Sequence, residues 1–180
     1  PDFEHAQDRF NRVVGADFNL ASKSNRWTGR TFIHQSFNPE KSKDAYSTGL
    51  SFDYNARVHS VSYNAVRIGD NYQSDLGFIR RTGILKNYFR YTYRIWLKSK
   101  NLRSLNFSQS FYYIGRPKDN YLMTDRGNWS DAELSFKNQA RLQLRYSNRY
   151  TFLQDSFDPT RSDALVPLEA QTGYNYDNIE

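Results

Sequence analysis

The sequence contains no cysteine, a single methionine and only five prolines. The absence of cysteine excludes a disulfide framework and any metal site built from thiolates. No run of about 18 apolar residues occurs, so the sequence predicts no transmembrane helix. The scarcity of proline argues against a disordered linker. These absences indicate a folded chain that relies on neither disulfides nor helical membrane spans.

Aromatic residues are abundant, at 17% of the chain, with 14 tyrosines and 13 phenylalanines. Tyrosine and phenylalanine favour pleated strands over helices. A length of 180 residues is enough for one domain with a real core, and we expect residues 1–180 to form a single unit with no internal domain boundary. The net charge of +6 keeps acidic surfaces and nucleic acid open as partners.

Period-two alternation runs through nearly the whole chain. Every second residue from Tyr46 to Val58 is apolar or aromatic, apart from one threonine, and the residues between them are small, polar or charged. Such alternation predicts strands with two chemically different faces. The predicted strands are Arg12–Ser22, Arg26–Phe37, Ala45–Val58, His59–Ile68, Leu85–Lys98, Arg103–Ile114, Trp129–Lys137, Arg141–Phe152 and a ninth that opens at Thr172–Tyr176.

The connections between these strands alternate in length. Those after the first, third, fifth and seventh strands are tight, and those after the second, fourth, sixth and eighth are long. In an up-and-down antiparallel sheet, alternate turns lie at the same end, so one end carries short turns and the other carries long loops. Bacterial transmembrane barrels have this asymmetry. The strands, at about 9–14 residues, also exceed the usual five or six of globular sheets and match membrane-spanning strands.

The sequence therefore predicts an all-β, up-and-down antiparallel transmembrane β-barrel. If the tight turns are periplasmic, the first strand runs from outside to inside, whereas barrel chains of this class begin on the periplasmic side. We therefore expect an internal portion, of about eight or nine strands, of a larger barrel.

Each face of the predicted sheet has an expected environment. Lipid suits the aromatic and apolar face, with tyrosine and tryptophan at the membrane interfaces. The residues expected to face lipid are Leu50, Phe52, Tyr54, Phe89, Tyr91, Tyr93, Leu142 and Leu144. The basic residues expected to face the lumen are Arg57, Arg90, Arg94, Arg141, Arg145 and Arg149. They could pair with Asp17, Asp53, Asp131 and Glu133.

Several stretches resemble one family. They are "NRVVGADFNLASKSNRWTG", "FIHQSFNP", "NYQSDLGFIRRTG" and "SNRYTFLQDSFDPT", and "LGFIRRTG" at Leu76–Gly83 is the most specific of them. The chain resembles, over essentially its whole length, the barrel region of Bacteroidota outer-membrane proteins of unknown function that carry an N-terminal family-9-like carbohydrate-binding sandwich. The resemblance implies an outer-membrane location, an integral barrel and further strands on both sides. The sandwich is missing, so the resemblance assigns no sugar-binding or catalytic residue.

Two features allow a functional and a structural interpretation. The long-loop motif contains Gly77, Phe78, Arg80, Arg81 and Gly83. Paired arginines suit phosphate, so this loop could constrict a pore or bind an anion, or it could be solvated and folded against its own barrel. Similarly, the arginines of the fifth and eighth strands could form a basic ladder that favours anions, or could brace the barrel through internal salt bridges.

Catalytic chemistry finds little support. The histidines, His5, His34 and His59, have no second ligand nearby in sequence, so we expect no metal site. No "GxSxG" nucleophile elbow and no phosphate-binding glycine loop occurs, and we expect no enzyme activity and no cofactor. Nucleic-acid-binding domains of the OB type are smaller, and their basic residues gather on one surface, so nucleic acid is not an expected partner.

The function expected is that of an integral outer-membrane β-barrel protein of the Gram-negative cell envelope. Its role would be structural, porin-like transport linked to glycan uptake, or a platform in a membrane protein complex. Its expected partners are outer-membrane lipid or lipopolysaccharide, and other outer-membrane or periplasmic proteins. The alternative is a soluble β-sandwich or barrel that binds glycan through exposed aromatic residues.

Overall fold

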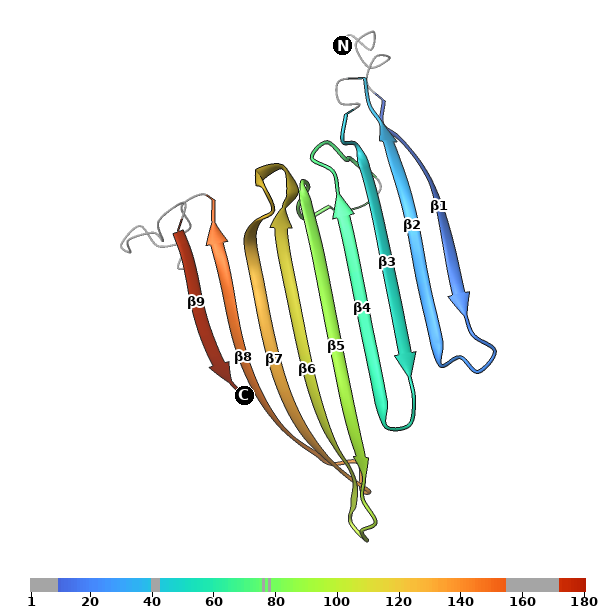
Figure 1. Ribbon diagram of the computed structural model, residues 1–180, viewed down its shortest axis with the longest axis vertical. Helices are drawn as coiled ribbons and strands as arrows, with labels where there is room; N and C mark the ends of the chain where they lie inside the picture. The colour runs from blue at the N-terminus through green and yellow to red at the C-terminus, as the bar shows by residue number, and fades with distance from the viewer. Residues whose placement is uncertain (1–9, 40–42, 76, 78, 155–171) are drawn as a thin grey trace, which may run out of the picture.

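A computed structural model of the chain describes residues 10–39, 43–75, 77, 79–154 and 172–180. These residues form one antiparallel sheet of nine strands that pair in sequence order, and one short 3-10 helix, η2 (Pro117–Asp119) (Figure 1). The strands are β1 (Arg12–Ala21), β2 (Trp27–Phe37), β3 (Tyr46–Asn55), β4 (His59–Ile68), β5 (Ile84–Trp96), β6 (Leu102–Arg116), β7 (Leu122–Phe136), β8 (Arg141–Leu153) and β9 (Thr172–Ile179). The prediction of an all-β, up-and-down antiparallel sheet is confirmed.

The register of the sheet extends the alternation of each strand across its neighbours. Tyr54 of β3 lies opposite Trp27 of β2 and Val61 of β4. Ser51, on the other face of β3, lies opposite Arg30 and Asn64. Residues directly opposite one another share a face, so each strand adds its apolar set to one side of the sheet and its polar set to the other.

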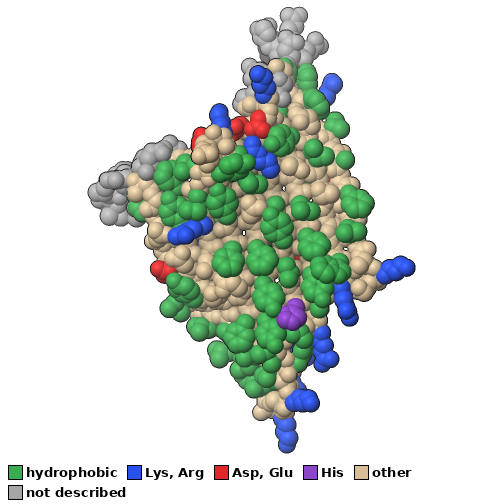
Figure 2. All heavy atoms as spheres, in the orientation of Figure 1, with side chains coloured by type: hydrophobic (Ala, Val, Ile, Leu, Met, Phe, Trp, Pro, Cys, Tyr) green, Lys and Arg blue, Asp and Glu red, His purple; other side chains and the backbone are tan. Residues whose placement is uncertain are grey.

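The two faces differ in both composition and burial. Large apolar side chains cover one face, which we call the apolar face, and Figure 2 shows them spread over most of the strands. The exposed hydrophobic residues of this face are Val14, Phe18, Leu20, Trp27, Ile33, Phe37, Leu50, Phe89, Tyr93, Phe107, Phe111, Leu142, Leu144, Tyr146 and Ile179. The other face, the polar face, holds buried small or acidic residues: Ser36, Ser47, Ser104, Ser108, Ser110, Asp125, Asp131 and Ser147. Among the described residues, the only buried hydrophobic ones are Ala45 and Tyr72.

A polar strip interrupts the apolar face where β6, β7, β8 and β9 lie side by side. Ser130 donates a hydrogen bond to Gln109 at 2.7 Å, and Gln109 donates one to Asn128. Tyr146 and Asn148 both donate to Asp177 at 2.8 Å. Because these groups satisfy one another, the strip has local hydrogen-bond partners on a face that is otherwise apolar.

The connections confirm most of the expected asymmetry between the two ends of the sheet. The short turns are residues 22–26, 56–58, 97–101 and 137–140, and they lie together at the lower end in Figure 1. At the other end, residues 38–45, 69–83 and 154–171 are longer. The prediction of a long loop between the sixth and seventh strands is wrong. β6 extends to Arg116 and β7 begins at Leu122, because the alternation continues through a β-bulge near Ile114.

The described sheet is not closed into a barrel. β1 pairs only with β2, and β9 pairs only with β8, within the residues that the structure describes. No second sheet packs on either face in this part of the chain.

No helix in the described residues is long and apolar enough to cross a membrane.

Candidate functional site

The long connection 69–83 is anchored at its base by close backbone packing. The amide of Gly83 donates to the carbonyl of Gly69 at 3.2 Å, and the amide of Asp70 donates to the carboxylate of Asp44 at 2.7 Å. Gly83 has φ +67°, and a Cβ there would lie 2.1 Å from Oδ1 of Asp70. The positive φ favours glycine at this position, where the end of the sequence motif returns the chain to β5.

The first half of this connection is tied to the neighbouring strands through Gln73. Its amide donates to the Ser36 hydroxyl at 3.3 Å, and its carbonyl accepts from the Asn11 side chain at 3.1 Å. Its own side chain accepts from Asn38 at 3.3 Å. These contacts join the connection to β2 and to the start of the described chain.

The second half crosses the polar face and reaches β7. The guanidinium of Arg81 pairs with the Asp125 carboxylate at 2.5 Å. Thr124 donates to the same carboxylate at 2.9 Å, and Thr151 of β8 does so at 3.5 Å. Asp125 is buried, so these donors compensate for a charge that would otherwise be costly to remove from water. The loop therefore passes over β5 and β6 rather than extending into solvent.

A cavity of about 740 Å³ lies between this loop and the polar face. Its lining from the loop is Tyr72, Ile79, Arg80 and Arg81. Its lining from the sheet is Ser47, Asn64, Val66, Ile68, Ile84, Lys86, Tyr88, Tyr112, Ile114, Asp125 and Trp129. Burial raises the pKa of the Tyr72 phenol above its ordinary value, so that side chain stays neutral at physiological pH.

The charge in this cavity is mainly positive. Arg81 is matched by Asp125, whereas Arg80 and Lys86 have no ion pair or hydrogen bond within the part of the chain that the structure describes. Both of these side chains are exposed. A phosphate, sulfate or carboxylate group entering the cavity would meet two available cations beside the aromatic rings of Tyr88 and Trp129.

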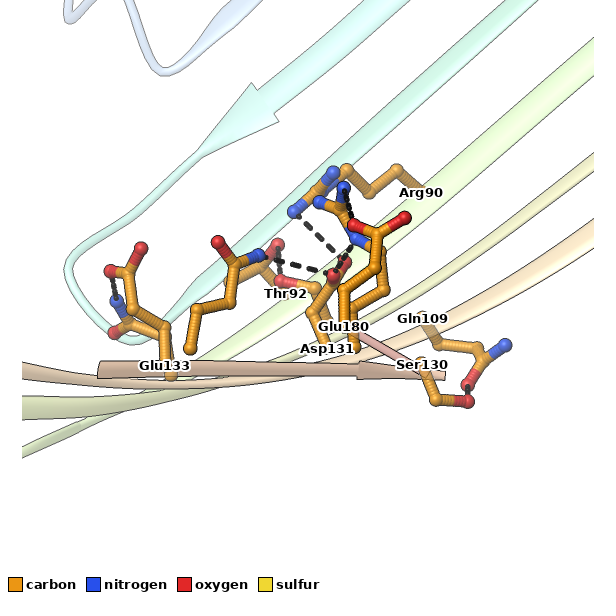
Figure 3. Close-up of polar contacts among 11 residues, drawn as sticks. Arg90, Thr92, Gln109, Ser130, Asp131, Glu133 and Glu180 are labelled. Atoms are coloured by element: carbon orange, nitrogen blue, oxygen red, sulfur yellow. Dashed lines mark hydrogen bonds and ion pairs between the residues drawn. The ribbon is translucent and has the colours of Figure 1, made fainter. Parts of the chain in front are cut away.

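A second polar cluster centres on Asp131 of β7 (Figure 3). Its side chain is 4% exposed, and it pairs with Arg145 at 2.6 Å and with Arg90 at 3.6 Å. Arg145 also lies 3.7 Å from Glu180. Figure 3 shows this cluster on one side of the sheet, whereas Gln109 and Ser130 belong to the other. One buried carboxylate thus ties together β5 and β8, which are not neighbours in the sheet.

The other predicted lumenal arginines have varied surroundings. Arg94 donates to Asn106 at 3.2 Å, and Asn106 donates to Glu133 at 3.0 Å. Arg149 stacks over the rings of Trp129 and Tyr176, with its guanidinium carbon 5.4 and 5.9 Å from their centroids. Arg141 is exposed at the start of β8. The arginines of β5 and β8 thus share the polar face, as expected, and those with partners brace the sheet.

Arg57 differs from the expectation. The predicted third strand reached Val58, but β3 ends at Asn55 because the amide of Ala56 donates to the carbonyl of His59 and closes a tight turn. Arg57 therefore projects from a turn and not from the polar face of a strand. Of its proposed acidic partners, Asp53 instead accepts from Ser62 at 2.5 Å.

All of the residues predicted to face lipid lie on the apolar face. Leu50, Phe89, Tyr93, Leu142 and Leu144 are exposed. The remaining three, Phe52, Tyr54 and Tyr91, are half-buried, since neighbouring rings cover them.

The loop motif contributes unequally to the cavity. Arg80 and Arg81 line it, Gly83 bonds to Gly69 at the base of the connection, and Gly77 is exposed. Phe78 lies outside the described residues. Sequence reasoning missed Asp125, which was assigned to a loop. The signal was present, because Asp125, Gly127 and Trp129 continue the alternation of Asp131 toward the N-terminus.

The histidines do not converge. His34 lies on the polar face of β2, stacked on Phe32, and His59 opens β4, where Nδ1 lies 2.7 Å from the Tyr91 hydroxyl. His5 lies outside the described residues. No group of three or more His, Asp or Glu side chains among the described residues is arranged to hold a metal ion.

Comparison with known proteins gives one family and no characterised relative. No curated protein and no solved structure matches the chain. A family described as a domain of unknown function, DUF5916, matches residues 4–177. This match covers almost the whole chain, and the protein therefore belongs to the DUF5916 family.

Proposed function

We propose that this chain forms part of the wall of an integral outer-membrane β-barrel with a transport role. The observation that carries the proposal is the inverted distribution of side chains. Large apolar residues are exposed on one face, while serines and aspartates are buried on the other. A soluble sheet buries its apolar face against another layer. A membrane barrel turns that face to lipid and its polar face to a lumen.

The dimensions and edges of the sheet support the same proposal. β1 to β8 are each 10 to 15 residues long, enough for a tilted strand to cross the hydrocarbon core. The outer edges of β1 and β9 carry backbone groups without a strand partner in the described sheet. Membrane strands require closure, because an open edge in lipid leaves those groups unsatisfied. Further strands of the full-length protein would supply it.

The connection 69–83 supports a transport role for such a barrel. It lies over the polar face, where it would narrow the lumen beside Arg80, Arg81 and Lys86. A positively charged constriction favours anionic solutes over cationic ones. The resemblance to Bacteroidota outer-membrane proteins that carry a carbohydrate-binding sandwich supports a location in the outer membrane, in contact with lipid or lipopolysaccharide, and a link to glycan uptake.

Fractionation of cells that make the full-length protein tests the location. We expect the peptide "TGILK" (residues 82–86) in the outer-membrane pellet after alkaline carbonate washing, released only by detergent. Recovery in a soluble fraction would contradict the membrane proposal and would favour the alternative, a soluble protein that binds glycan through exposed aromatic residues.

Charge substitution tests which face meets lipid. Leu50→Arg and Phe89→Arg are expected to cost roughly 2–4 kcal/mol of folding free energy in bilayers, because each places a charge near mid-membrane. The matched controls Ser51→Arg and Thr92→Arg change residues on the polar face of the same two strands. Equal costs at both pairs would contradict the assignment of the apolar face to lipid.

A further inference from the structure

The short-turn end of the sheet has an unusual charge. In the turns 22–26, 56–58, 97–101 and 137–140, every charged residue is a cation. These cations are Lys23, Arg26, Arg57, Lys98, Lys100 and Lys137. All are exposed, and none has an ion pair with another described residue. Figure 2 shows Lys and Arg side chains along the lower right edge, where Figure 1 places most of these turns.

The connections at the opposite end of the sheet differ in charge. Its described connections contain both acids and bases: Asp44, Asp70, Asp75 and Asp119 beside Lys43, Arg80, Arg81 and Lys118. Two of these acids form ion pairs, with Asp44 3.7 Å from Arg67 and Asp119 3.0 Å from Arg116. The positive charge of the short turns is therefore a local property of one end, not an even spread of the net charge.

A row of aromatic residues on the apolar face borders the same end. Trp27, the first residue of β2, has its ring centroid 4.2 Å from that of Tyr54. His59, the first residue of β4, lies 5.2 Å from Tyr93. Trp27 and Tyr93 are exposed. Tryptophan and tyrosine concentrate at the boundary between hydrocarbon and headgroups, so this row indicates the depth at which the headgroups begin.

Trp96, the last residue of β5, lies on the polar face opposite Ser104 and holds one of the basic turns. Its indole nitrogen donates to the carbonyl of Arg57 at 2.9 Å. The guanidinium carbons of Arg57 and Arg94 lie 5.8 and 5.6 Å from its ring centroid. Arg57 is thus held on the polar side of its turn. On the apolar side, Arg26 directly precedes Trp27 of the aromatic row, so the basic turns begin at the depth of that row.

We propose that the short-turn end of the sheet is a binding surface for anionic phospholipid headgroups. Lysine and arginine side chains attract anionic headgroups and can donate hydrogen bonds to their phosphates. No acid in the turns competes for them. The proposal rests on the membrane-spanning function proposed above and adds to it a lipid preference and an anchored end.

The test measures lipid selectivity of the full-length protein in phosphatidylcholine bilayers. Trace spin-labelled phosphatidylglycerol or phosphatidylcholine is added, and electron paramagnetic resonance gives the fraction of each lipid that the protein immobilises. We expect phosphatidylglycerol to be enriched at least about twofold over phosphatidylcholine at low salt, with most of the excess lost at 1 M salt, where charges are screened within about 3 Å.

Two charge-matched variants locate the effect. Lys98→Gln/Lys137→Gln removes two of the six cations of the short turns and should lower the excess of phosphatidylglycerol by about a third. Lys43→Gln/Lys118→Gln removes the same charge from the opposite end and should leave the excess unchanged. Equal immobilisation of both lipids by the wild type, or equal losses in the two variants, would overturn the proposal. Absence of any immobilised lipid would instead contradict the membrane-spanning function itself.

Discussion

The guanidinium of Arg81 lies 2.5 Å from the carboxylate of Asp125, although the two residues are 44 positions apart in the sequence. This ion pair fastens the longest described connection to the polar face of β7. The sequence alone left two interpretations of this loop motif open. The ion pair holds the motif against the sheet, where it lines a cavity.

Breaking that pair should release the loop. Asp125→Asn and Arg81→Gln are each expected to increase proteolytic cleavage within residues 69–83 several-fold, because the contact to β7 is lost. Since Arg81 is half exposed, the coupling energy in a double-mutant cycle should be about 1 kcal/mol. Arg80→Gln, which removes a neighbouring cation without an ion pair, is the control. Equal cleavage of all three variants would contradict the role of the ion pair.

The backbone conformation of Gly83 predicts that adding a methyl group at this position lowers the stability of the fold. Gly83→Ala should lower the free energy of unfolding by about 1–3 kcal/mol, because the residue has positive φ and its Cβ would meet Asp70. Gly77→Ala in the same loop should change stability far less, since the nearest atom to its Cβ is Ser74 Oγ at 3.6 Å. Urea unfolding of the two variants measures both free energies. Similar losses of stability would contradict a special requirement for glycine at position 83.

The burial of Asp131 predicts a large effect from removing one charge. Asp131→Asn leaves Arg90 and Arg145 without their shared carboxylate, and we expect a loss of about 2 kcal/mol or more in folding free energy. Asp17→Asn breaks the exposed pair with Arg30 and should cost less than about 1 kcal/mol. A cost at Asp131 no larger than at Asp17 would mean that the cluster does not brace the sheet.

The polar strip on the apolar face predicts a non-additive response. Gln109→Leu alone leaves Asn128 and Ser130 without their shared partner and should destabilise the protein by about 1 kcal/mol in bilayers. The triple variant Gln109→Leu/Asn128→Leu/Ser130→Ala removes every member and should recover that stability. If the triple variant is less stable than the single one, the strip makes a contact beyond this hydrogen-bond network.

The strands were largely predictable because successive side chains of a strand point to opposite faces, so a strand with two different faces shows alternation in its sequence. The predicted bounds of His59–Ile68 match β4, and most others differ from the observed strands by one to three residues. The failures share one cause. At Val58 and at Leu122 the boundary depends on backbone hydrogen bonds and a bulge, which side-chain alternation does not record.

The sequence by itself determined the two chemically distinct faces, the order of the strands and the basic short turns, since each follows from neighbouring residues in an up-and-down sheet. Only the tertiary structure decided which side the loop 69–83 covers and which acids meet which arginines. The contacts of Arg81 with Asp125 and of Arg90 with Asp131 cross intervening strands. They depend on register accumulated over the sheet, and no local pattern specifies it.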